Sequence, residues 1–194
     1  MRLRWGFKTE AEEYAEEFRA ELDLEIDGPL CPFRLASHLE VPVVLLSQLE
    51  NFPRKCLEYF QNGGQSEFSA TTVNDGSYRL IVHNDSHHPY RQNSNVMHEI
   101  AHIVLGHPPR PPVTGDGCRH FDPLLEKEAN ELGFALLVPK RAALRIIEMQ
   151  MGMELACATY GVSSKLLRYR LSITNAKGWA DNRRRKFHHA AEQA

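Results

Sequence analysis

Residues 96–107 read Val-Met-His-Glu-Ile-Ala-His-Ile-Val-Leu-Gly-His, and they are the most informative stretch of this sequence. Apolar positions from 91 to 105 repeat with helical spacing, and Gly106 with the prolines at 108–112 predicts the end of that helix. His98 and His102 are four residues apart, so both imidazoles would project from one face and could bind one metal ion. Glu99 lies about 100° around the helix from His98, where it could reach a metal-bound water as a general base without being a ligand.

The competing interpretation of His98 and His102 is a pair of hydrogen-bonded histidines in the protein core. The residues that flank them are apolar and would bury the helix: Ile100, Ala101, Ile103, Val104 and Leu105. A buried helix has no structural use for two histidines and a glutamate unless something pairs them, because unpaired polar groups are costly to bury. Seven of the ten histidines also fall between positions 83 and 120, which favours a metal site.

A catalytic zinc ion needs a third protein ligand and an open position for water, and the next predicted helix offers three carboxylates. Asp122 and Pro123 are typical of a helix start, and this helix is predicted to run to residue 137. The residues that would form its buried stripe are Leu125, Ala129, Leu132 and Leu136. Glu128 borders that stripe and is the predicted third ligand, whereas Glu126 and Glu131 are expected to face solvent.

The remaining pattern predicts an α+β protein that is mostly helical with a small antiparallel sheet. Further helices are expected at residues 9–22, near 32–39, 49–60, 140–151, 154–160 and 163–173. Strands are expected at residues 41–46, 67–73 and 78–82, with a hairpin turn at 74–77. The predicted organisation is a catalytic domain at residues 1–138, a helical helix-turn-helix-like part at 139–174 and a basic, flexible tail at 175–194.

Two stretches of this sequence resemble the ImmA/IrrE family of zinc metallopeptidases. Residues 91–107 (RQNSNVMHEIAHIVLGH) are similar to the active-site helix of that family, and residues 126–139 (EKEANELGFALLVP) are similar to its second signature. The resemblance implies one zinc ion bound by His98, His102 and Glu128, with Glu99 as general base. It also implies a core like that of the thermolysin-like zincins, and helix-turn-helix transcriptional repressors as substrates, cut under stress or in mobile elements.

Peptide hydrolysis by such a site also needs a donor for the oxygen of the scissile carbonyl group. The candidates for this transition-state donor are His107, His120, Tyr78 and Tyr90, and the sequence does not choose among them. His107 is also a weak candidate for a metal ligand, because it lies past the glycine that ends the helix. Residues 67–73 could form an edge strand that aligns an extended substrate, although an ordinary sheet edge fits the same pattern equally well.

Residues 155–171 form a helix-turn-helix pattern with Lys165, Arg168 and Arg170 on its second helix. These three residues could contact nucleic acid, but a helical corner packed on the catalytic domain is the favoured interpretation, since the net charge of the chain is -2. Two functions therefore fit the sequence. One is a site-specific zinc endopeptidase that cuts a regulatory protein, and the other is a DNA- or partner-binding regulator with a structural or vestigial zinc site.

The composition is that of a globular protein without a membrane-spanning segment. Of the 194 residues, 42% are hydrophobic and 25% are charged, as in ordinary globular proteins. No apolar run approaches the roughly 18 residues of a membrane span, and the amino terminus lacks the apolar core of a secretory leader. The four cysteines are widely spaced, so we expect reduced thiols and a cytoplasmic protein that does not associate with membranes.

Overall fold

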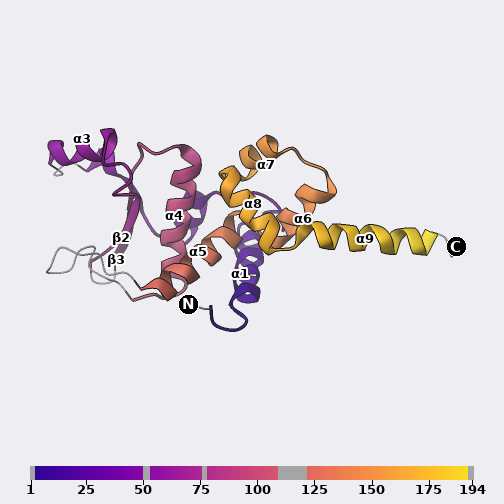
Figure 1. Ribbon diagram of the computed structural model, residues 1–194. Coiled ribbons are helices and arrows are strands. Elements are labelled where there is room, and N and C mark those ends of the chain that lie inside the picture. The colour runs from indigo at the N-terminus through magenta and orange to yellow at the C-terminus, as the bar shows by residue number, and fades with distance from the viewer. Residues whose placement is uncertain (1–2, 50–52, 76–77, 109–121, 192–194) are drawn as a thin grey trace.

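The structure is a computed structural model that describes residues 3–49, 53–75, 78–108 and 122–191. It is mostly helical with one small sheet (Figure 1), which confirms the predicted α+β class. The helices are α1 (Phe7–Glu21), α2 (Pro32–His38), the 3-10 helix η1 (Leu46–Gln48), α3 (Arg54–Asn62), α4 (Pro89–Val104), α5 (Pro123–Leu137), α6 (Lys140–Glu148), α7 (Met153–Tyr160), α8 (Ser164–Ile173) and α9 (Ala176–Ala191). The strands are β1 (Val43–Leu45), β2 (Ala70–Asp75) and β3 (Tyr78–His83).

The sheet has the strand order β1-β3-β2, so β3 is central. β2 and β3 are antiparallel, and Thr72 pairs with Ile81. β1 is parallel to β3, with Val43 paired to the same Ile81. The sheet is therefore mixed rather than purely antiparallel, because η1, α3 and β2 lie between β1 and β3 in the chain and let β3 return in the direction of β1. Within the described residues β2 pairs only with β3, so it is an edge strand, as the sequence predicts.

The core lies where α4 packs against α5, with α1 also packed on α5. Met97 and Ile100 of α4 and Leu132 of α5 are completely buried, as their helical spacing predicts. A Cβ atom at Gly133 would lie 3.4 Å from the carbonyl oxygen of Met97 and 3.5 Å from the Cα atom of His98. The two helices therefore approach closely beside His98, and the packing that builds the core also brings α5 to the predicted metal site.

Two buried arginines fix the C-terminal end of α5. Arg19 of α1 is completely buried, and its guanidinium group donates to the carbonyl oxygen of Leu136 at 2.8 Å. Arg170 of α8 donates to the carbonyl oxygen of Val138 at 2.7 Å. The last carbonyl groups of a helix have no partner within the helix, so these guanidinium groups supply the missing donors and join α1 and α8 to α5.

The sequence predicts a flexible tail from residue 175, but residues Ala176–Ala191 form α9. Ala176 and Ala180 are one turn apart and buried, and α9 contacts α6 and α8. The ammonium group of Lys140 lies 4.4 Å from the centre of the Trp179 ring, which adds a cation–π contact. Burial of this first part stabilises the helix, which then extends away from the rest of the molecule (Figure 1).

The described helices include none that is long and apolar enough to span a lipid bilayer. Cys31 and Cys56 are exposed and Cys157 is buried, and all three are free thiols as the sequence predicts. Cys118 lies outside the described residues.

Candidate active site

α4 carries His98 and His102 in its last two turns. Their rings meet edge to face with centroids 4.7 Å apart, and their Nε2 atoms are separated by 3.1 Å. The side chains are 22% and 20% exposed, so solvent reaches them although the helix around them is buried. The helical spacing therefore brings the two imidazoles together, as the sequence predicts.

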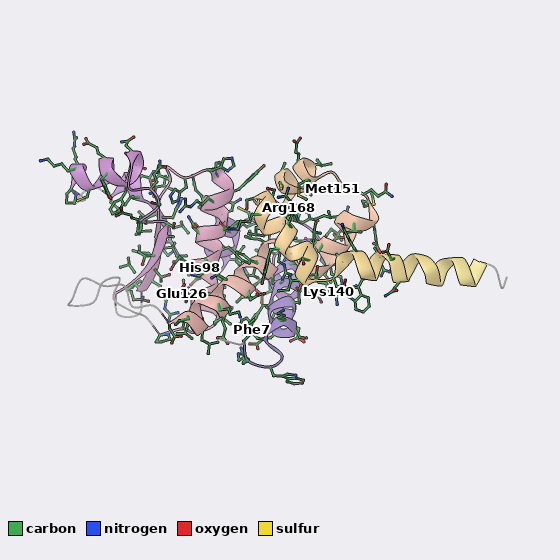
Figure 2. The ribbon with its side chains drawn as sticks, viewed as in Figure 1. Phe7, His98, Glu126, Lys140, Met151 and Arg168 are labelled. Carbon is green, nitrogen blue, oxygen red and sulfur yellow. The ribbon has the colours of Figure 1, made fainter. Side chains whose placement is uncertain are left out.

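The carboxylate that joins the two histidines is Glu126, in the first turn of α5. One carboxylate oxygen lies 3.1 Å from Nε2 of His98, and the other lies 3.6 Å from Nε2 of His102. Figure 2 shows the labelled side chains of His98 and Glu126 next to each other between α4 and the start of α5. Asp122 fixes the start of α5, because its side chain accepts a hydrogen bond from the backbone N–H of Leu124 at 2.9 Å. We call His98, His102 and Glu126 the metal cluster.

Glu128, the third ligand expected from the sequence, is not beside the two histidines. It is 7% exposed and lies between Arg4, 3.4 Å from its Oε1 atom, and His107, 3.6 Å from its Oε2 atom. The sequence predicts the ligand at the edge of the buried stripe of α5. The carboxylate that lies beside the two histidines is instead on the partly exposed side of the helix, where the Glu126 side chain is 30% exposed. A group in this position suits a catalytic metal, which must keep one position open to water and substrate.

The metal cluster fits a zinc ion by the chemistry and spacing of its donors. Two ring nitrogens and one carboxylate oxygen lie within 4.8 Å of one another, and no other group of this kind occurs in the part of the chain that the structure describes. Contacts with His102 and His98 hold the pKa of Glu126 far below its usual value. Two histidines and one carboxylate form a three-ligand set that leaves a fourth position open in catalytic zinc sites.

Glu99, the predicted general base, follows His98 on α4 and is half-buried. Its carboxylate accepts a hydrogen bond from the hydroxyl group of Thr72 at 2.7 Å. Thr72 belongs to the edge strand β2, so the sheet fixes the orientation of Glu99. Thr72 could not be predicted from the sequence, since nothing in the spacing of residues 67–73 indicates which side chain faces α4.

A model of the IrrE N-terminal-like domain (Peptidase_M78) matches residues 56–172, which is more than half of the chain. The matched region contains α4, α5 and all the residues of the metal cluster together with Glu99. The chain belongs to the IrrE N-terminal-like domain family. No curated protein and no solved structure matches the chain. This family is one of zinc metallopeptidases, so the match supports a metallopeptidase-like function for the chain.

The four residues predicted as transition-state donors differ in where they lie relative to the metal cluster. His107 lies behind His102, with their Nδ1 atoms 2.8 Å apart, and its side chain is only 7% exposed. Burial, with a smaller contribution from His102, lowers the pKa of His107, which favours the neutral ring. Tyr78 is 81% exposed at the start of β3. Tyr90 is in the first turn of α4, about 12 Å from His98 along the helix axis, and His120 lies outside the described residues.

The region that the family model matches contains α7 and all of α8 except its last residue, Ile173. Lys165 and Arg168 are exposed on α8 and stay available for an interaction. Arg170 is 3% exposed, and besides Val138 it binds the carboxylate of Glu12 on α1 at 2.5 Å. Arg170 therefore holds α8 to the rest of the domain and cannot contact nucleic acid, because its position on the helix points inward.

Proposed function

We propose that this protein is a zinc-dependent endopeptidase that makes limited, site-specific cuts in a regulatory protein, namely a helix-turn-helix transcriptional repressor. One observation carries the proposal. The three groups of the metal cluster converge at a partly exposed point, and a fourth group, Glu99, follows His98 on α4 without joining them. A purely structural zinc site has no need for a carboxylate that lies beside its ligands without binding the metal.

His98, His102 and Glu126 would hold the ion. When bound, zinc supplies Lewis acidity toward a water molecule and toward the scissile carbonyl group. Glu99 accepts a proton from the attacking water and returns it to the amine that leaves. The hydroxyl group of Thr72 occupies one oxygen of Glu99, which leaves the other oxygen to handle the proton.

The open edge of β2 supports a substrate that binds in an extended conformation. β2 contacts α4 and carries Thr72, so a peptide paired along this edge would pass beside Glu99. Since β2 has only six residues, Ala70–Asp75, it would align a short segment. The choice of a repressor as substrate rests on the resemblance of the two signature stretches.

The test compares the wild-type protein with Glu99→Gln, which keeps the shape of the side chain and removes its basicity. Both proteins, loaded with zinc, are incubated with candidate helix-turn-helix repressors, and the products are identified by mass spectrometry. We expect discrete fragments from the wild type, and a rate lower by a factor of about 10²–10⁴ for Glu99→Gln with unchanged zinc content. Glu17→Gln, the same change at an exposed residue of α1, serves as the control.

Equal cleavage by the wild type and Glu99→Gln would show that Glu99 is not the base. The alternative function, a DNA-binding regulator, rests on the exposed Lys165 and Arg168 of α8. Salt-sensitive binding to a DNA duplex that survives Glu99→Gln and is lost in the double variant Lys165→Glu/Arg168→Glu would favour it, if no repressor is cut. With α8 as a packing element, the double variant should change the free energy of unfolding by less than about 0.5 kcal/mol and leave cleavage unchanged.

A further inference from the structure

His107 is brought back onto α4 by the turn that ends this helix. Gly106 has a φ of +63°, a backbone conformation that favours glycine, and the backbone N–H of His107 donates to the carbonyl oxygen of His102 at 3.0 Å. The His107 ring then packs edge to face against the His102 ring, with centroids 4.9 Å apart. His107 therefore covers the side of His102 that faces away from the metal cluster.

The contact between these rings allows only one arrangement of protons when His102 binds a metal. Nε2 of His102 points to the metal cluster, 3.1 Å from Nε2 of His98, so a metal ligand at this atom needs its lone pair free. The proton of the neutral His102 ring is then on Nδ1, which lies 2.8 Å from Nδ1 of His107. Nδ1 of His107 must accept this hydrogen bond, so the proton of the neutral His107 ring is on its Nε2 atom.

Glu128 favours that position of the His107 proton. Its Oε2 atom is 3.6 Å from Nε2 of His107, close enough for the negative charge to stabilise an N–H group directed at it. The other carboxylate oxygen lies 3.4 Å from the Arg4 guanidinium group, which supplies a counter-charge for this buried residue. Glu128, which is neither in the metal cluster nor the proposed base, thus fixes the position of the His107 proton.

We propose that His107 is a positioning residue for the metal centre, with Glu128 as its partner: together they hold the Nδ1 proton of His102 and aim its Nε2 lone pair at the ion. This inference rests on the zinc site of the proposed function. The other histidine ligand differs, because Nδ1 of His98 is buried without a hydrogen-bond partner among the described residues. Metal-binding histidines usually donate their second N–H group to a partner that fixes the ring, and among the described residues only His102 has one.

The test measures zinc affinity by competition with a chromophoric chelator, for His107→Leu and His107→Gln beside the wild type. Leucine fills the space but cannot accept a hydrogen bond, so we expect zinc affinity to fall about 10–100-fold. Glutamine can accept from Nδ1 of His102 through its amide oxygen and donate to Glu128 through its amide N–H, so it should restore most of the affinity. His38→Leu, at a histidine paired with Glu21 elsewhere, is the control and should bind zinc like the wild type.

Absorption spectra of the cobalt-substituted proteins provide a second readout, since a misdirected His102 ring changes the ligand field and a distant packing defect does not. We expect His107→Leu to alter the spectrum and His107→Gln to preserve it. Zinc affinity of His107→Leu within twofold of the wild type, or equal losses in the leucine and glutamine variants, would overturn the inference. A wild-type protein that binds no zinc would instead contradict the proposed function, and the inference with it.

Discussion

The metal cluster and the two arginines, Arg19 and Arg170, lie at opposite ends of α5. The two ends differ in how their buried or half-buried polar groups are paired. At the C-terminal end, each guanidinium group donates to carbonyl oxygens that the helix leaves unpaired, so donors meet acceptors. At the N-terminal end, two ring nitrogens and a carboxylate face one another within 4.8 Å. As metal ligands these three groups all present lone pairs to the same point. They can therefore face one another favourably only when a cation lies between them.

The arginine end of α5 shows how completely a structural polar site is paired. Arg19 also donates to the carbonyl oxygens of Ala15 at 2.9 Å and Gly28 at 2.8 Å. Burial lowers the pKa of Arg19 to about 10, which still leaves the group charged at neutral pH. Buried polarity alone therefore does not identify a functional site in this protein. What distinguishes the metal cluster is that like groups converge and stay partly open to solvent.

The largest effect should come from removing the carboxylate of the metal cluster. Glu126→Ala is expected to lower zinc affinity by more than the roughly 10–100-fold loss that an outer partner causes, because a direct ligand is lost. Glu128→Ala, two residues along the same helix, should stay within that smaller range. Chelator competition measures both. If Glu128→Ala released the metal and Glu126→Ala retained it, Glu128 would regain the ligand role that the sequence suggested.

At the arginine end the expected effect is on stability rather than on zinc. Arg19→Leu should reduce the free energy of unfolding by about 3–5 kcal/mol, because it leaves buried carbonyl groups without donors. Zinc affinity of the folded protein should not change. Urea denaturation of the metal-free protein measures the loss. Arg145→Leu is the control, since the Arg145 side chain is 51% exposed and its ion pair with Asp27 should contribute less than about 1 kcal/mol. Equal losses for the two variants would show that the buried hydrogen bonds of Arg19 do not stabilise the fold more than an exposed ion pair does.

The smallest effect concerns His83 of β3. This buried imidazole belongs neither to the metal cluster nor to the arginine end of α5. It is 1% exposed, and neither ring nitrogen has a hydrogen-bond partner among the described residues. Burial lowers the pKa of His83, while nearby Asp85 and His87 act in opposite directions. The folded state thus binds fewer protons than the unfolded state below about pH 6.5, so stability is full above that pH and falls as the solution becomes more acidic.

His83→Leu removes this unpaired group and should raise the free energy of unfolding by about 1 kcal/mol at pH 7. The gain should be larger at pH 5.5, where the wild type must exclude a proton that the variant cannot bind. Denaturation series at both pH values measure the difference. A gain that is the same at the two pH values would mean that His83 does not titrate differently in the folded and unfolded states.

The elements that repeat with a clear helical period were predictable, because the period alone places their residues. His98, Glu99 and His102 share one helix, so their relative positions follow from 3.6 residues per turn. Asp122 and Pro123 likewise marked the start of α5 through local capping chemistry. The family resemblance noted in the same two stretches is confirmed by the match over residues 56–172.

Residues that meet across elements were decided only by the tertiary structure. A helical period says which residues of α5 share a face but not how far the helix is rotated against α4, and that rotation places Glu126 at the histidines and Glu128 behind them. The pairing of Thr72 with Glu99 depends on how β2 sits against α4. The helical pattern of residues 164–173 does not distinguish Arg170 from a surface cation, and its burial follows from its contacts with Glu12 of α1 and with Val138, directly after α5. Contacts between distant segments depend on packing, which no local pattern encodes.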